Sequence, residues 1–286
     1  MLVLILSAPV AGIAADEDNQ GDVVQLQDVV VTATKTEKAL EDVPGSVSVI
    51  TQEDLEKQDI QTVDEALRLT PGIFAKRTKG LMDSTPSVSI RGLKGDQYTL
   101  LLIDGQPVND AYTGGVQWGS LPISNIERIE VVRGPASALY GGNAMGGVIN
   151  IITKAPEKLE MLASGGYGSN NTYRTRFSVG DLLWERFSIQ VGYEEEGTDG
   201  YVTTPVVRSI TSGKGNVSGG YAMNDSTGNP TKWVVGDKGD NGAFHSAFNI
   251  KSGLKLSDTG SLTLSIMSGR HDYDYGSPNS YMDTFG

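Results

Sequence analysis

The chain has 286 residues, enough for two domains, with a formal net charge of -12 at pH 7. So acidic a chain lacks the basic footprint of nucleic-acid binders, which excludes a nucleic-acid partner. It contains no cysteine, so disulfides, thiolate metal sites and a lipoprotein anchor are excluded. With two histidines, His245 and His271, a histidine-rich metal or haem site is not expected. We therefore expect no metal ligands and no cofactor.

Residues 1–15 form an apolar run, MLVLILSAPVAGIAA, followed directly by an acidic triplet. The run is too short to span a bilayer, and its small final residues resemble the cleavage site of a secretory signal. No basic residue precedes it, and a buried N-terminal helix is the alternative. We expect a signal peptide over 1–15, export of the protein, and a flexible acidic segment over 16–39.

Three consecutive valines, Val29, Val30 and Val31, lie within this flexible segment. A β-branched run on a tether suits a strand that is added to the sheet edge of another protein, where backbone hydrogen bonds provide the affinity. The alternative is a first strand of the domain that follows.

The pattern of residues 40–154 is typical of one compact α/β domain. A strand is expected over 46–50. Thr51 with Asp54, and Thr62 with Glu65, have the spacing of capping boxes. They predict short helices over 52–58 and 63–69.

Two further strands are expected in the middle of this domain. The segment 87–92 alternates polar and apolar residues, so it should be half exposed. The segment 98–105 is apolar almost throughout, so it should be buried on both faces. Its last two residues, Asp104-Gly105, predict a tight turn.

The stretch 126–154 reads IERIEVVRGPASALYGGNAMGGVINIITK. It predicts a strand over 126–132, a short helix over 136–140 with Pro135 in its first turn, and a strand over 148–153. Its glycines are reminiscent of a phosphate-binding loop, but no Gly-Lys-Ser/Thr ends the stretch and no GxGxxG with a downstream acid fits. A nucleotide site is therefore not expected.

Beyond residue 154, apolar and polar residues alternate, for example over 173–179 and 187–194. This period is typical of transmembrane β-barrels. A soluble β-sandwich has the same period, but inward arginines such as Arg174 and Arg176 suit a water-filled lumen better. We expect roughly five strands over residues 159–275.

Three expectations concern the polar parts of this region. His245 and His271 should face solvent or a barrel lumen. Residues 197–241 should form a long extracellular loop. The segment DKGDNG at 237–242 has the acids of a weak calcium site or of an ordinary solvated loop.

Four motifs appear in the order found in the plug domain of TonB-dependent outer-membrane receptors. They are a strand ending in Arg91-Gly92, the turn at 103–105, Leu121-Pro122 and the stretch 126–154. Over 28–154 the chain resembles this family, most closely siderophore and colicin receptors, with cobalamin receptors close behind. The resemblance implies an α+β plug domain over 40–154. Antiparallel strands of an incomplete transmembrane β-barrel, truncated relative to the family's about 22 strands, would follow over 155–286.

The resemblance also identifies the valine run as a TonB box, the peptide that TonB captures in the periplasm. The box comprises Asp28, Val29, Val30, Val31, Thr32, Ala33 and Thr34, with Val29 where the family often has Thr. TonB would act with the inner-membrane ExbB–ExbD motor. The protein would lie in the outer membrane of a Gram-negative cell, in contact with lipid. The plug would lie inside the barrel and the N-terminus in the periplasm.

The family's plug arginines pair with glutamates of the barrel wall. Arg91 and Arg133 match them in position, so the resemblance implies that they latch the plug, with Glu127 and Glu130 in the same network. Loops over 78–86 and 109–119 should face the ligand. Tyr112, Gln117 and Trp118 are candidates for ligand contact or, alternatively, ordinary loop anchors.

The resemblance implies a receptor for active uptake of a scarce ligand, and not an enzyme. A ferric siderophore is the metal-chelate ligand we expect. Its binding outside would expose the TonB box, and rearrangement of the plug would open the path. The alternatives are a cobalamin or haem receptor of the same family, or a plug-bearing binding or signalling module that does not transport because its barrel is incomplete.

Overall fold

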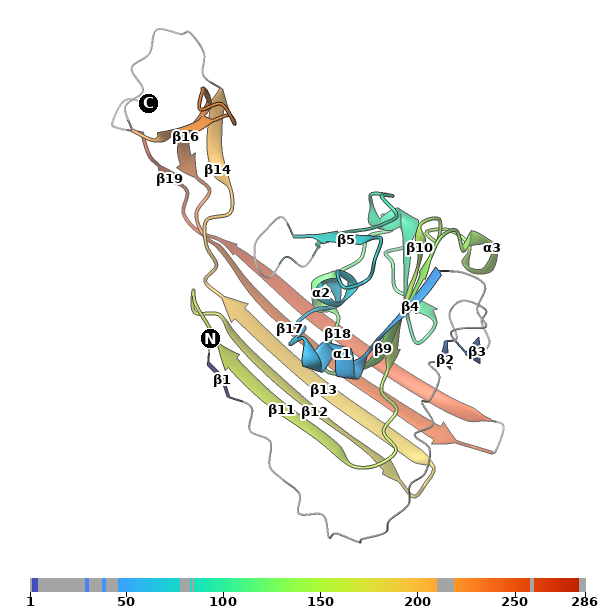
Figure 1. Cartoon of the computed structure of the whole chain (residues 1–286). Helices are drawn as coiled ribbons and strands as arrows, with labels where there is room; N and C mark the ends of the chain where they lie inside the picture. The colour runs from blue at the N-terminus through green and yellow to red at the C-terminus, as the bar shows by residue number, and fades with distance from the viewer. Residues whose placement is uncertain are drawn as a thin grey trace, which may run out of the picture.

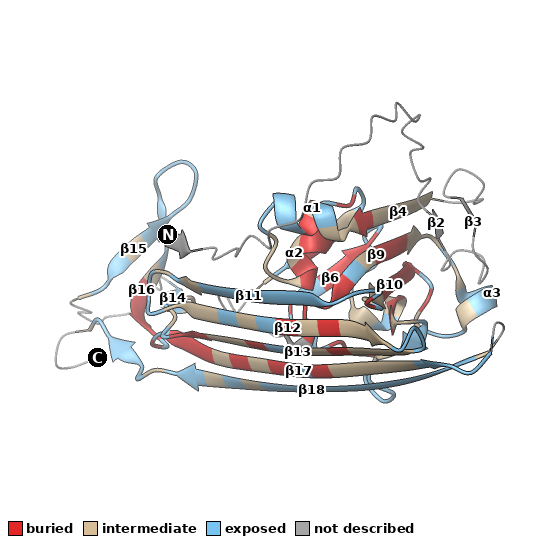
Figure 2. Cartoon of the chain, turned by 90° about the horizontal axis from the view of Figure 1, so that it is seen from below, coloured by how far each residue is buried: buried red, intermediate tan, exposed pale blue. Residues whose placement is uncertain are grey.

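The computed structural model describes residues 2–4, 29–30, 38–39, 46–77, 83, 85–209, 219–257 and 260–282. An α/β unit (residues 46–154) lies against one face of a six-stranded antiparallel sheet, here called the wall sheet (Figures 1 and 2). Most of the predicted signal peptide and flexible segment lies outside the described residues, as do parts of the predicted loops over 78–86 and 197–241.

The α/β unit is built on a five-stranded sheet in the order β4-β9-β10-β7-β8. In this sheet β10 runs parallel to β7, and the other neighbouring pairs are antiparallel. The strands are β4 (Ser46–Thr51), β7 (Thr99–Ile103), β8 (Gln106–Pro107), β9 (Ile126–Arg133) and β10 (Gly147–Thr153). A separate antiparallel pair is formed by β5 (Ile73–Lys76) and β6 (Ser87–Ile90). The helices are α1 (Gln52–Lys57), α2 (Val63–Leu67), α3 (Ser137–Tyr140) and the 3-10 helices η2 (Asp96–Tyr98) and η3 (Trp118–Ser120).

β7 is buried on both faces, as its apolar sequence predicts. Leu101 packs into the main core with the apolar face of α2. Leu100 and Leu102 point the other way, into a smaller cluster with Val148 of β10. One apolar layer packs on each face of β7, which accounts for its continuous run of leucines.

Two cap predictions for the short helices had different outcomes. The capping box at α1 is confirmed, because Thr51 and Asp54 each bind the other's backbone. The box at α2 is wrong, since the Thr62 side chain donates to Asp64 Oδ1 at 2.7 Å instead of capping the helix. Glu65 accepts from the backbone N–H of Gln61 at 2.9 Å, one residue before the position that a capping box requires.

Two smaller expectations also differ from the structure. Pro135 lies outside α3, which begins after Ala136, so proline does not fill its first turn. Ser89 of β6 is buried although alternation predicts exposure, and its hydroxyl lies 3.4 Å from the carbonyl oxygen of Phe74 on the paired strand.

The wall sheet has the strand order β1-β11-β12-β13-β17-β18 and is not closed into a barrel among the described residues. Its strands are β1 (Leu2–Leu4), β11 (Glu160–Tyr167), β12 (Tyr173–Leu183), β13 (Phe187–Thr198), β17 (Asn241–Lys255) and β18 (Ser261–Tyr275). Alternation directs polar side chains such as Gln190 and Asn249 toward the α/β unit, where they are buried, and leaves Leu262 and Leu264 exposed. The predicted antiparallel barrel strands are confirmed.

Part of the predicted loop over 197–241 is folded. β14 (Pro205–Ser209), β15 (Tyr221–Asn224), β16 (Pro230–Asp237) and β19 (Asn279–Ser280) form a small sheet that projects beyond one end of the wall sheet (Figure 1). The Asp237 carboxylate accepts hydrogen bonds from Tyr281, Asn279 and the Gly239 N–H. Protein donors therefore occupy this acid of the candidate calcium segment.

In the described part of the chain, no helix has both the length and the apolar character needed to cross a bilayer.

Candidate functional site

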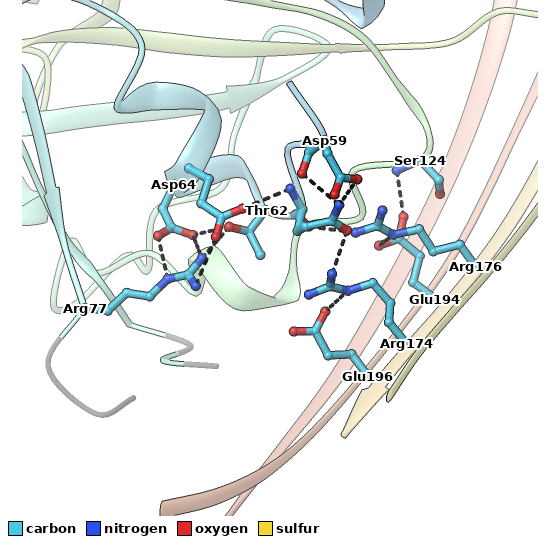
Figure 3. Close-up of polar contacts among 11 residues, drawn as sticks. Asp59, Thr62, Asp64, Arg77, Ser124, Arg174, Arg176, Glu194 and Glu196 are labelled. Carbon is cyan, nitrogen blue, oxygen red and sulfur yellow. Dashed lines mark hydrogen bonds and ion pairs between the residues drawn. The ribbon is translucent and has the colours of Figure 1, made fainter. Parts of the chain in front are cut away.

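The wall sheet holds the α/β unit at the turn between α1 and α2 (Figure 3). Arg174 Nη1 donates to Gln61 Oε1 at 2.6 Å, and Arg176 Nη2 donates to the Gln61 backbone carbonyl at 2.8 Å. Both arginines lie on β12. Because they are two residues apart, their side chains project from the same face of the strand, the face that is turned toward the α/β unit. Two guanidinium groups thus bind both carbonyl oxygens of one glutamine.

Neighbouring glutamates on β13 orient these arginines. Register pairs Arg174 with Glu196 and Arg176 with Glu194 across the two strands. Arg174 Nε is bonded to Glu196 Oε2, and Arg176 Nε lies 3.7 Å from Glu194 Oε2. Glu194 also accepts from the backbone N–H of Ser124 in the α/β unit at 2.7 Å. We call Arg174, Arg176, Glu194 and Glu196 the wall cluster.

The α/β unit binds the two donors of Gln61 from its own side. Gln61 N donates to Glu65 Oε2 at 2.9 Å, and Gln61 Nε2 donates to the carbonyl of Asp59 at 2.8 Å. Asp59 has φ 50°, which places it in the left-handed region where α1 ends. Every polar group of Gln61 therefore has a partner, and those partners come from both bodies.

Arg77 extends this network inside the α/β unit. It forms a two-pronged contact with Asp64, with Nε–Oδ2 at 2.8 Å and Nη2–Oδ1 at 2.9 Å, and lies 3.3 Å from Glu65 Oε1. Burial opposes its charge, but the hydrogen bond and the negative charge of Asp64 raise the pKa of Arg77 above its ordinary value. Arg77 is the last described residue before the predicted ligand-facing segment.

Two other contacts join the bodies away from Gln61. Lys251 Nζ on β17 lies 3.0 Å from Asp104 Oδ2 and donates to the Thr153 carbonyl at 3.1 Å. Tyr273 on β18 donates to Asp83 Oδ1 at 3.2 Å. The α/β unit is thus attached to four wall strands, β12, β13, β17 and β18, by polar contacts.

A cavity of about 30 Å³ lies between the two bodies beside the wall cluster. His245 and His271, paired across β17 and β18, both line it, with ring centroids 6.0 Å apart. The histidines therefore lie on the face of the wall sheet that is turned toward the α/β unit. Across the described residues, no group of three or more His, Asp or Glu side chains is arranged to hold a metal ion.

The residues predicted to latch the plug make contacts within the α/β unit. Arg133 donates to the Pro71 carbonyl at 2.6 Å and to Ser48 Oγ at 2.9 Å. Glu130 is fully buried beside Arg128, and Glu127 pairs with that same arginine. These positions do not test the latch, which stays a prediction.

Arg91, the other predicted latch residue, has φ 53°. Its guanidinium faces Gly134, the residue after Arg133, and Arg91 Nη1 lies 3.1 Å from where a Cβ on that glycine would be. The two predicted latch arginines are thus brought together at one end of β9.

The three candidate ligand-contact residues are placed differently from one another. Tyr112 is 97% exposed and Gln117 is exposed, and Gln117 also lines an open cavity of about 470 Å³ beside β18. Trp118 is 0% exposed and packs in the core of the α/β unit. A ligand would reach Trp118 only if η3 moved.

The predicted TonB box is described at two residues. β2 (Val29–Val30) pairs antiparallel with β3 (Lys38–Ala39), which lies just before the α/β unit. The other five residues of the box lie outside the described residues.

The chain matches the TonB-dependent Receptor Plug Domain family over residues 39–148. It is 37% identical over 175 residues to the vitamin B12 transporter BtuB of Vibrio vulnificus, and 38% identical over 177 residues to an iron-regulated outer membrane virulence protein of Vibrio cholerae. These alignments cover 61% and 57% of this chain, and 28% and 26% of the relatives.

A solved structure extends the likeness into the wall sheet. The siderophore receptor PirA from Acinetobacter baumannii matches with a TM-score of 0.55 and 27% identity, over 80% of this chain and 32% of that protein. The chain thus spans a quarter to a third of the length of the relatives named here. These relatives are transporters and receptors, not enzymes. The α/β unit is therefore a plug domain of the TonB-dependent receptor family, and the wall sheet is built like the antiparallel barrel strands that follow the plug in such receptors.

Proposed function

We propose that the protein is an outer-membrane receptor that takes up a ferric siderophore actively through TonB. The observation that carries this proposal is the way the plug is attached to the wall sheet. The two bodies meet through hydrogen bonds and ion pairs of Gln61, Ser124 and Asp104, and the main apolar core consists of plug residues alone. Such an interface can open without breaking the core of the plug, which active transport through a plugged barrel requires.

The proposed mechanism begins with ligand binding at the outer face of the plug. Exposed Tyr112 and Gln117 are the proposed plug contacts, with Trp118 joining them only if η3 moves. Binding would make residues 28–34 available to TonB, driven by ExbB–ExbD, and pulling would displace the plug. The proposal includes a Gram-negative outer-membrane location, a periplasmic N-terminus, and the division into signal peptide (1–15), flexible segment (16–39), plug (40–154) and barrel strands (155–286).

Cobalamin is the second candidate ligand. The observation in its favour is the 37% identity to a protein named as a vitamin B12 transporter. Iron-siderophore uptake is preferred because the structural likeness extends to a siderophore receptor over 80% of the chain.

Uptake by cells tests the proposal. The gene would be expressed in a host without siderophore or cobalamin receptors, and uptake of radiolabelled ferric siderophores and of cobalamin would be measured. We expect ferric siderophore uptake that disappears when the host lacks TonB. Cobalamin uptake alone would establish the second candidate, and uptake of neither would contradict both.

A proline substitution tests the TonB box in the same cells. Val30→Pro removes a backbone donor and should abolish uptake while ligand binding to cells stays unchanged, because strand addition depends on backbone hydrogen bonds. Val24→Pro, the same change in the preceding segment, is the matched control and should transport normally. Normal uptake by Val30→Pro would contradict the assignment of residues 28–34 as the TonB box.

A further inference from the structure

We propose that Arg174 and Arg176 are the positioning residues that seat the plug on the wall, and that Gln61 is the plug residue they recognise. This role differs from the predicted latch at Arg91 and Arg133, which lies at another part of the plug. It also goes beyond the proposed transport, because it concerns how the plug is held before any ligand or TonB is bound.

The chemistry of Gln61 is the first argument. Arg174 takes its side-chain oxygen and Arg176 its backbone oxygen, while both of its donors are bound by plug residues. Hydrogen bonds in which one partner is charged are about twice as strong as neutral ones. The turn therefore offers two acceptors to the wall in a geometry that the plug itself fixes.

The burial and pairing of the arginines are the second argument. The side chains of Arg174 and Arg176 are 25% and 12% exposed, so their charges are largely withdrawn from water. Glu196 and Glu194 balance these charges from the next strand and leave other guanidinium N–H groups free to reach the plug. An arginine can do this because its planar fork serves two partners at once, whereas lysine offers a single point charge.

Ser124 is a second plug residue that binds the wall cluster, and this contact is the third argument. Its backbone N–H donates to Glu194 at 2.7 Å, although it lies 63 residues after Gln61 in the chain (124 minus 61). The wall cluster thus accepts from one plug segment and donates to another. Two plug segments that are remote in sequence are positioned by four adjacent side chains.

Amide hydrogen exchange in the purified, full-length protein tests the seat without ligand or TonB. In the double variant Arg174→Gln/Arg176→Gln, we expect the amides of residues 59–62 and of Ser124 to exchange about tenfold faster or more, as the loss of charged hydrogen bonds predicts. Arg270→Gln is the matched control. Arg270 lies on β18 in an exposed pair with Asp272, and its loss should leave these amides unchanged.

Two plug variants at Gln61 keep the test decisive if the wall variant does not assemble. Gln61→Glu gives up the donor to the Asp59 carbonyl but keeps the oxygen that Arg174 binds and adds a negative charge beside two arginines, so it should retain most of the protection. Gln61→Lys opposes two arginines and should lose the protection. A merely structural role for this side chain would make both variants alike. Equal exchange in Gln61→Lys and the parent protein would overturn the proposal, and so would equal loss in Gln61→Lys and Gln61→Glu.

Discussion

Thr51 and Asp54 close the first turn of α1 by binding each other's backbone. Thr51→Ala removes the acceptor for the Asp54 N–H. An N-cap change of this kind costs about 1 kcal/mol, so the exchange of α1 amides should rise several-fold. Glu53→Gln on the same helix, in an exposed pair with Lys57, is the control and should change little.

The same cap predicts how the helix responds to acid. The hydrogen bond from the Thr51 backbone, followed by that from its hydroxyl, holds the pKa of Asp54 below its ordinary value of 3.8. The carboxylate therefore contributes stability above the ordinary pKa, and that stability is lost as pH falls through the lower, folded value. Protection of α1 measured between neutral pH and about pH 2 should fall at the acid end. In Asp54→Asn, the protection of the α1 amides should be lower at neutral pH and should no longer fall at the acid end. An unchanged fall at acid pH in that variant would contradict the role assigned to Asp54.

At the scale of elements, β10 depends on a glycine at its first position. A Cβ on Gly147 would overlap the carbonyl oxygen of Val132 on β9 and approach Ile90 Cδ1 to 3.0 Å. Gly147→Ala should lower the free energy of unfolding of the plug by about 1–3 kcal/mol, through overpacking. Denaturant-dependent proteolysis of the plug measures this.

Gly142, in the same glycine-rich stretch, is the matched control. A Cβ there has no neighbour within 4 Å, so Gly142→Ala should unfold like the parent protein. Equal destabilisation by both substitutions would mean that backbone freedom, not the close approach of β9 and β10, explains the glycines.

The elements of the plug were largely predictable because their signals are local. The alternation in β9, the β-branched run of β10, the apolar run of β7 and the turn at Asp104 are each complete within a few residues. The capping box at α2 was predicted wrongly because Thr62 and Glu65 have the required spacing, while Asp64 and Gln61 are their actual partners. Spacing alone does not show which neighbouring group a side chain binds.

The contacts between the bodies were predictable only in part. Alternation placed Arg174 and Arg176 on the inner, polar face of a strand. Their partner Gln61 is 113 and 115 residues away, in a turn with no pattern that marks it. The burial of Trp118 was likewise missed, because glycines and polar residues around it are typical of an exposed loop.

At the scale of the whole molecule, Lys251 on β17 attaches the plug to the wall sheet at a point separate from the wall cluster. Lys251→Met removes its contacts with Asp104 and Thr153, and local opening at the Thr153 amide should become easier by about 1–2 kcal/mol. Lys255→Met, an exposed lysine at the end of the same strand, should have no effect. If the two variants exchange alike, Lys251 does not contribute to holding the plug.

The place of β4 determines how the plug would bear a mechanical load. β4 is the edge of the five-stranded sheet, and among the described strands β9 is its one neighbour, paired from Ser46 to Thr51. Arg133 reinforces that seam through its bond to Ser48. A force applied to the chain ahead of Ser46 would act first on this seam, which can peel one residue pair at a time. β4 would then detach from the sheet while the other four strands stayed paired.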